Sequence, residues 1–152
     1  MFKLISKFSK KPLISDSAIK HSSLGDFTIN PRTGKISKFK CGGHGEENIK
    51  FLKDNNIDFN VAYEYNNGVR VGNVPGHKEK KKRSGNNQTW FPKCWNRKTI
   101  KKAGEKVLKK NNNLPNGKQA TSMYKNVKVG IRKTNGQVAT IYPTKDQKGG
   151  IK

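Results

Sequence analysis

The clearest pattern in the chain is an alternation of apolar and polar residues in its middle. Apolar side chains recur at every second position from Ile57 to Tyr65, and three valines follow within the next nine residues. This spacing is typical of strands with one buried face. Asn67-Gly68 separates the two runs, and because both residue types tolerate a positive φ, the pair predicts a type I′ turn. The stretch therefore predicts a β-hairpin that ends at Pro75.

Two other segments have the three- and four-residue spacing of amphipathic helices. Residues 46–55 begin with two acids, which favour a helix N-terminus, and continue with Ile49 and Leu52 on one side. Asn96 is a suitable N-cap for a second helix, which Asn111 ends. Its apolar stripe consists of Ile100, Ala103, Val107 and Leu108.

The end of the chain predicts a three-stranded meander over residues 121–124, 127–132 and 138–142, with a turn at Asn135-Gly136. Strict alternation in the last strand places Val138, Thr140 and Tyr142 on one face, and Ala139 and Ile141 on the other. The aromatic residues Trp90, Phe91 and Trp95 are expected to pack in the core.

These elements predict an α+β domain, with a helical and irregular N-terminal part and antiparallel sheets. Its length of 152 residues favours one domain. We expect this domain to span residues 21–152. Residues 1–20 carry five lysines and no sustained period, so they predict a basic linker or a weakly packed segment, with a first helix near residues 2–8 as one option.

The composition points to a polyanionic partner. Lys+Arg number 33 against 10 for Asp+Glu, which gives a formal net charge of +23. Nucleic acid is the first candidate, an acidic protein the second and a membrane surface the third. No run approaches the ~20 apolar residues of a membrane span, and the first residues lack the apolar core of a signal peptide.

A dense basic run lies after the predicted hairpin. It is either a solvated loop or a segment that binds RNA phosphates, in which case the affinity for RNA would depend on salt concentration. The run consists of Lys78, Lys80, Lys81, Lys82 and Arg83.

The three histidines, His21, His44 and His77, are the residues that best suit nucleic-acid chemistry. Two imidazoles beside a phosphodiester can cleave RNA without a metal, because one accepts the proton of the ribose 2′-OH and the other protonates the leaving oxygen. Glycines surround His44 just before a predicted helix N-terminus, where phosphate binds favourably.

Metal chemistry has little support in the sequence. The ten acids are scattered, and the two cysteines, Cys41 and Cys94, lack Cys-x-x-Cys spacing. We therefore expect no metal and no other cofactor, and two thiols rather than a disulfide bond.

Four short motifs follow one another along the chain between residues 21 and 145. They are His21-Ser-Ser-Leu-Gly-Asp-Phe, Gly42-Gly43-His44, Thr89-Trp90-Phe91-Pro92 with Trp95, and Ala139-Thr140-Ile141-Tyr142-Pro143. Together they resemble the EndoU endoribonucleases, above all the bacterial EndoU domains at the C-termini of polymorphic and contact-dependent toxins. The resemblance implies a ribonuclease A-like superfamily architecture.

The resemblance also implies site residues. His21 and His44 match the acid/base pair, and Thr140 and Tyr142 match a Ser/Thr-x-Tyr pair that contributes to catalysis and nucleoside binding. The family's lysine before Phe-Pro has no counterpart here, so Thr89, Lys82 and Lys93 are the candidates for the third catalytic group. The reserve for His21 is His77.

The function implied is a metal-independent endoribonuclease that leaves a cyclic phosphate on RNA, with tRNA as one candidate substrate. The resemblance further implies secretion as the C-terminal part of a larger bacterial toxin, action in the target-cell cytoplasm, and an acidic cognate immunity protein. Outside that complex we expect a monomer. The alternatives are a non-catalytic basic RNA- or DNA-binding module and a metal-dependent DNA nuclease toxin.

Overall fold

The computed structural model describes residues 14–75 and 87–152, and it has the predicted α+β fold. The helices of these residues are α2 (Asp16–Ser23), α3 (Glu46–Asp54) and α4 (Arg97–Lys110). The strands are β1 (Asp26–Ile29), β2 (Ile36–Cys41), β3 (Asn60–Glu64), β4 (Arg70–Asn73), β5 (Gln88–Trp90), β6 (Gln119–Tyr124), β7 (Val127–Thr134) and β8 (Gln137–Pro143). None of these helices is long and apolar enough to cross a membrane.

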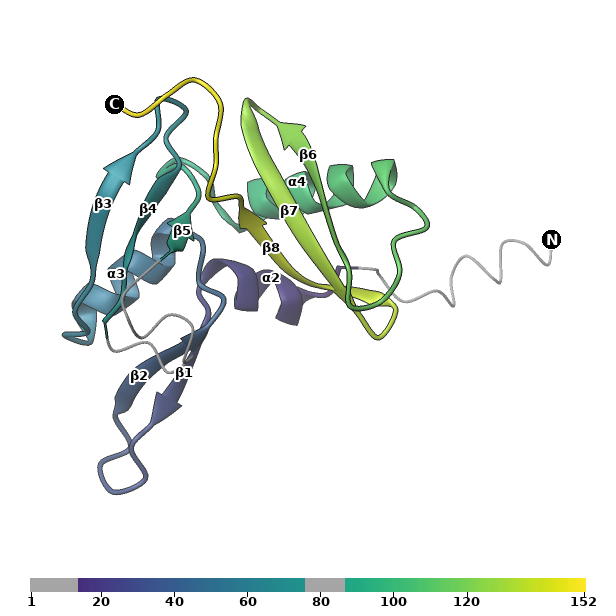
Figure 1. The fold of residues 1–152 in the computed structure, drawn as a ribbon. Coiled ribbons are helices and arrows are strands. Elements are labelled where there is room, and N and C mark those ends of the chain that lie inside the picture. Colours follow the sequence, from purple (N-terminus) through teal and green to yellow (C-terminus); the bar gives the residue numbers. More distant parts are fainter. Residues whose placement is uncertain (1–13, 76–86) are drawn as a thin grey trace.

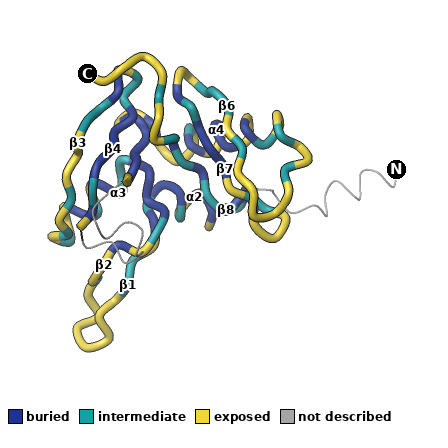
Figure 2. The backbone as a smooth tube through the Cα atoms, viewed as in Figure 1, coloured by how far each residue is buried: buried dark blue, intermediate teal, exposed yellow. Residues whose placement is uncertain are grey.

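The strands form three antiparallel sheets, ordered β1-β2, β3-β4-β5 and β6-β7-β8. Figure 1 shows the sheet β6-β7-β8 with α4 against one face, and the sheet β3-β4-β5 with α3 on the other side of the molecule. Helix α2 runs beside β8 between these two halves, and the β1-β2 hairpin projects away from both. Figure 2 shows that most of the projecting hairpin is exposed.

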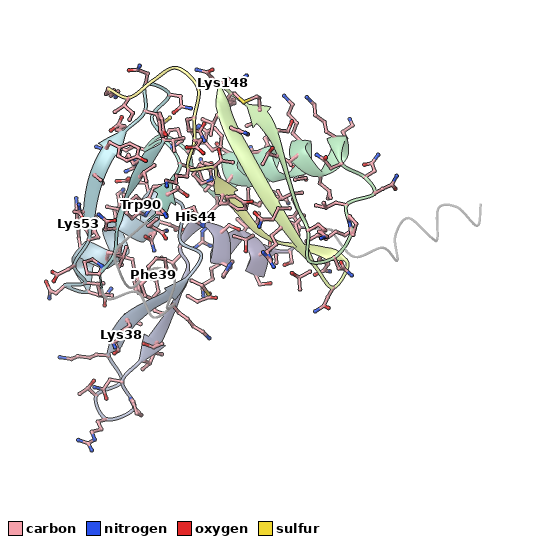
Figure 3. All side chains as sticks on the ribbon, in the orientation of Figure 1. Lys38, Phe39, His44, Lys53, Trp90 and Lys148 are labelled. Atoms are coloured by element: carbon pink, nitrogen blue, oxygen red, sulfur yellow. The ribbon has the colours of Figure 1, made fainter. Side chains whose placement is uncertain are left out.

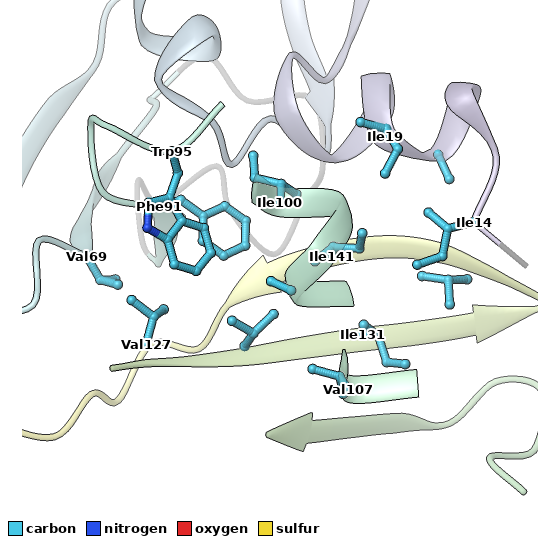
Figure 4. Packing of buried hydrophobic residues seen from close by; sticks show 14 of the residues in the cluster. Ile14, Ile19, Val69, Phe91, Trp95, Ile100, Val107, Val127, Ile131 and Ile141 are labelled. Atoms are coloured by element: carbon cyan, nitrogen blue, oxygen red, sulfur yellow. The ribbon is translucent and has the colours of Figure 1, made fainter. Parts of the chain in front are cut away.

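Two hydrophobic clusters hold the fold. The larger lies between α2, α4 and the sheet β6-β7-β8, and it includes Phe91 and Trp95, whose rings stack with centroids 4.9 Å apart (Figure 4). The smaller surrounds Trp90 beneath α3. The predicted core role of the three aromatic residues is therefore confirmed.

Both predicted helices form where their patterns begin and end. The side chain of Asn96 caps α4 by accepting a hydrogen bond from the backbone N–H of Thr99. Helix α3 starts with Glu46 and Glu47, as expected from the helix dipole.

The type I′ turn predicted at Asn67-Gly68 is wrong. Of the two residues only Gly68 has a positive φ, of 95°. The Tyr65 carbonyl accepts from the Gly68 N–H at 2.9 Å, and the Tyr65 N–H donates to Val69 at 2.8 Å, which makes a three-residue turn. The Asn67 side chain accepts from the Val69 N–H within the turn and also donates to the Asn126 carbonyl.

The strict alternation predicted for the last strand is also wrong, because β8 contains a bulge. Thr140 pairs with Arg132 and Val138 pairs with Lys133, so Ala139 has no partner on β7. The extra residue places Val138 in the core together with Ile141, rather than with Thr140. Thr140 and Tyr142 are half-buried and share the opposite face of the strand.

The segment before residue 21 contributes to the folded domain. Helix α2 begins at Asp16 behind a Ser15 cap, and Ile14 and Ile19 are buried in the larger cluster. The boundary expected at residue 20 therefore falls within α2. The helix suggested for residues 2–8 and the basic run of residues 78–83 lie outside the described residues.

Ser22 joins α2 to the last strand. Its buried hydroxyl donates to the Ala18 carbonyl at 2.7 Å and accepts from the Ile141 N–H at 2.9 Å. Replacing Ser22 by Ala would leave that buried N–H without its acceptor, so we expect a loss of about 1–3 kcal/mol in the free energy of unfolding. Denaturant unfolding measures this loss.

The matched control is Ser17→Ala, a change of the same residue type on an exposed position of the same helix. Its expected effect is within about 0.5 kcal/mol. Equal stabilities of the two variants would contradict the assigned role of Ser22.

Candidate active site

Backbone hydrogen bonds hold the two predicted site histidines next to each other. The loop between β2 and α3 lies along the end of α2, where the His44 N–H donates to the Ser22 carbonyl at 2.6 Å and the Gly43 N–H donates to the His21 carbonyl at 2.9 Å. On its other side the His44 carbonyl accepts from the Phe91 N–H at 2.7 Å. Figure 3 shows His44 near the centre of the molecule, between its two halves.

Glycine is required in this loop for steric reasons. Gly42 and Gly43 have φ values of 72° and 73°. A Cβ on Gly42 would collide with the His21 carbonyl oxygen, and one on Gly43 would collide with the Asn48 side chain. Gln88 holds the loop from β5 by donating its amide to the Gly43 carbonyl at 2.9 Å. The glycines thus allow the backbone approach that brings the histidines together.

His44 is buried, and its contacts fix which ring nitrogen carries the proton. Nδ1 lies 2.8 Å from the Thr89 carbonyl oxygen, which can only accept a hydrogen bond. Nδ1 is therefore the donor, and in the neutral ring Nε2 bears the lone pair. The Thr89 hydroxyl lies 3.3 Å from the same Nδ1. Thr89 therefore orients the ring and lies on the side away from Nε2.

His21 is held in the same manner by a carboxylate. Its Nδ1 lies 2.8 Å from Oδ2 of Asp26, and its Nε2 lies 3.2 Å from the hydroxyl of Thr140. An ionised carboxylate only accepts, so Nδ1 carries a proton and Nε2 faces Thr140. Sequence reasoning missed Asp26, although it lies five residues after His21 within the first motif, and a carboxylate is a common partner of a catalytic imidazole.

Tyr142 lies on the same face as Thr140 and beside His44. Its ring centroid is 6.1 Å from that of His44. The ring covers Gly130 on the neighbouring strand, where a Cβ would collide with it, and the hydroxyl donates to Gln119. Burial raises the pKa of the Tyr142 hydroxyl above its usual value, against a smaller opposing effect of the charge of Arg132. The hydroxyl therefore keeps its proton at neutral pH and remains a donor.

Arg132 is a second residue that sequence reasoning missed. It pairs directly with Thr140 across β7 and β8, so its side chain lies on the face that carries Thr140 and Tyr142. It is exposed, and it is close enough to Tyr142 to influence the pKa of its hydroxyl. Only the strand register reveals this placement, and the bulge at Ala139 sets that register.

The structure does not bring every predicted site residue to this place. Lys93 lines two cavities beside Glu46, and neither cavity includes His21 or His44. His77, Lys82 and the rest of the basic run lie outside the described residues. A groove of about 320 Å³ runs from Ser15 to Asn135, and His21 is the member of the site that lines it.

Metal-binding side chains occur here in one cluster among the described residues. His21, Asp26 and Cys41 each offer one ligand atom, and these three atoms lie within 4.8 Å of one another. Cys41 and Cys94 are not joined by a disulfide bond.

Comparison with known proteins gives one family match. A model of the bacterial EndoU nuclease family matches residues 15–145, a range that includes all four residues of the cluster formed by His21, His44, Thr140 and Tyr142. Searches of curated proteins and of solved structures found no significant match.

The geometry predicts the tautomers of the two histidines. When neutral, both His21 and His44 should carry the proton on Nδ1, because each Nδ1 faces an oxygen acceptor. Nitrogen chemical shifts from two-dimensional NMR of the ¹⁵N-labelled protein distinguish the tautomers. An Nε2–H form of neutral His44 would contradict the assigned orientation of its ring.

Proposed function

The chain belongs to the bacterial EndoU nuclease family, and we propose that it is a metal-independent endoribonuclease. The observation that carries this proposal is the pair of histidines, each with Nδ1 held by an oxygen, beside Thr140 and Tyr142. In the proposed reaction the ribose 2′-OH attacks the neighbouring phosphorus, the 5′-oxygen leaves, and the product ends in a 2′,3′-cyclic phosphate.

The surroundings of the histidines suggest their roles. His44 has a neutral carbonyl partner at Nδ1 and a lone pair on Nε2, which suits the general base that removes the 2′-OH proton. His21 has the Asp26 carboxylate at Nδ1, which compensates the charge of an imidazolium and suits the general acid. The acid then donates its Nε2 proton to the leaving 5′-oxygen.

A cation is needed where negative charge develops on the phosphorane. Arg132 supplies one, since it lies on the face of Thr140 and its guanidinium is always charged. It thus offers a third group in place of the lysine that the sequence lacks. Tyr142 would orient the ribose through its hydroxyl or stack through its ring, and Thr140 would contact the base.

Charge supports RNA as the substrate. The formal net charge of +23 attracts a polyanion and favours contacts with phosphates that do not depend on the base sequence of the RNA. Transfer RNA is one candidate substrate. The basic run from Lys78 to Arg83 would add further contacts with RNA phosphates.

The proposed setting is that of a toxin. The domain would be secreted as the C-terminal part of a larger bacterial protein and would act in the cytoplasm of the target cell. A producing cell must neutralise it, and an acidic immunity protein that covers the histidines would match its charge. Apart from that complex we propose a monomer.

Removing the proposed base tests the function. We expect His44→Ala to lower RNA cleavage by about 10²–10⁴-fold, the usual contribution of general acid–base catalysis. Cleavage by the wild type should survive excess EDTA and leave a 2′,3′-cyclic phosphate or its hydrolysis product. Gel assays of labelled RNA, with mass spectrometry of the ends, measure both.

Three outcomes would contradict this function. Loss of activity with EDTA, or products with a 5′-phosphate, would indicate a metal-dependent nuclease. Binding of RNA without any cleavage by the wild type would indicate a non-catalytic binding module. Wild-type cleavage by folded His44→Ala would remove the proposed site.

The role of Arg132 has its own test. We expect Arg132→Gln to lower kcat by about 10²–10³-fold, as for loss of one group that stabilises transition-state charge. The matched control is Lys133→Gln, which removes one positive charge from the residue next to Arg132. Lys133 pairs with the buried Val138 and therefore lies on the other face of the sheet. Both variants should bind RNA slightly less tightly, and a similar kcat for both would exclude a catalytic role of Arg132.

A further inference from the structure

Three structural elements bring a nitrogen, an oxygen and a sulfur ligand together around Nδ1 of His21. His21 comes from α2, Asp26 from the start of β1 and Cys41 from the end of β2. Asp26 and Cys41 are direct partners in the β1-β2 pairing. The Asp26 carboxylate oxygen lies 2.8 Å from Nδ1 of His21 and 3.4 Å from Sγ of Cys41, and all three ligand atoms lie within 4.8 Å of one another.

The strand pairing makes this arrangement a consequence of the fold. The two ligands on the strands are fixed by the base of the hairpin, where it joins the body of the protein (Figure 1). The carbonyl of His21 accepts the Gly43 N–H just after β2, which fixes α2 against the same strand. The ligand set is therefore preorganised, and part of it is accessible, because the Asp26 side chain is 49% exposed.

The donor set selects the kind of ion. Thiolate, imidazole and carboxylate are the three ligand types of zinc, whereas magnesium and calcium prefer oxygen ligands alone. Zinc bonds of about 2.0–2.3 Å in a tetrahedron place neighbouring ligand atoms about 3.3–3.7 Å apart. Small side-chain rotations would bring the three atoms to this spacing, and a water or a phosphate oxygen would take the fourth position.

We propose that His21, Asp26 and Cys41 form a zinc site that switches the nuclease off. On binding, the Cys41 thiol loses its proton to solvent, and the thiolate, the carboxylate and Nδ1 of His21 become ligands. Coordination at Nδ1 removes the proton from that nitrogen, so the neutral ring carries its only proton on Nε2. The tautomer of His21 is thereby reversed.

This reversal blocks the role proposed for His21. A metal-bound imidazole cannot also be an imidazolium, and the Asp26 carboxylate no longer pairs with the ring. His21 would then present a fixed N–H to Thr140 and could not act as an acid that releases and regains its proton. The inhibitory effect rests on the proposed function, whereas zinc binding itself does not depend on it.

Binding is tested with cobalt(II) and zinc on the full chain. We expect cobalt(II) to give the near-ultraviolet absorption of a thiolate–cobalt bond in the wild type. The matched variants are Cys41→Ser and Cys94→Ser, because Cys94 is exposed and is outside the cluster. Cys94→Ser should keep the band, and Cys41→Ser should lose it and bind zinc at least about 10-fold more weakly by calorimetry.

Inhibition is tested by RNA cleavage with and without zinc, each variant being its own reference. Zinc should inhibit the wild type and Cys94→Ser reversibly, with recovery on addition of EDTA. Inhibition of Cys41→Ser should require a zinc concentration at least about 10-fold higher than inhibition of the wild type. Absence of the cobalt band in the wild type, an equal band in both variants, or equal inhibition of both would overturn the proposal. A band that requires Cys41 in a protein that cleaves no RNA would retain the metal site and overturn the nuclease mechanism.

Discussion

Consecutive backbone hydrogen bonds from the amides of residues 43, 44 and 45 to the carbonyls of residues 21, 22 and 23 hold the end of α2 against the loop before α3. The two histidines belong to these paired segments, so their separation is set by main-chain geometry and not by flexible side chains. Gly42 is needed because a Cβ there would collide with the His21 carbonyl, and Gly43 is needed because a Cβ there would collide with the Asn48 side chain of α3. The arrangement of the other site residues follows from this contact, since α2 also lies along β8 and orients His21 toward Thr140.

A buried ion pair supports the other side of the same loop. Arg70 of β4 is almost fully buried, and its guanidinium donates to Glu46, the first residue of α3, and to the Phe91 carbonyl. Its Nε has no hydrogen-bond partner among the described residues. Removing Glu46 would leave a buried charge uncompensated, which costs far more than the pair itself contributes. His44 therefore lies between two rigid supports, α2 on one side and the Arg70 connection on the other.

The sequence predicted those parts of the fold that depend on local chemistry. The Asn96 cap, the two acids that start α3 and the C-terminal meander were predicted because neighbouring residues determine them. The family resemblance supplied His21, His44, Thr140 and Tyr142, which the structure places together. In the three-residue turn before Val69, the Asn67 side chain accepts from the Val69 N–H and also donates to the Asn126 carbonyl, a tertiary contact that no local pattern contains.

Asp26 and Arg132 were missed for a related reason. The relevance of Asp26 comes from its contact with the His21 ring in the folded protein, and that of Arg132 comes from Thr140, which lies opposite it on β8. Strand register is a long-range property, and a one-residue shift moves a side chain to the other face. In β8 the alternation misled because an unpaired residue interrupts it.

The unpaired Ala139 also has a consequence for how β8 tolerates insertions and deletions. After the two-residue turn at Asn135-Gly136, Thr134 pairs with Gln137 and Lys133 pairs with Val138. The next pair is Arg132 with Thr140, so Ala139 is passed over. Losing one residue at position 139 would close the bulge and leave Thr140 opposite Arg132. A deletion nearer the end of the strand, beyond Thr140, would instead move Tyr142 out of its pairing with Gly130. Within this strand, chain length can therefore vary at the bulge while the face that carries Thr140 and Tyr142 stays in place.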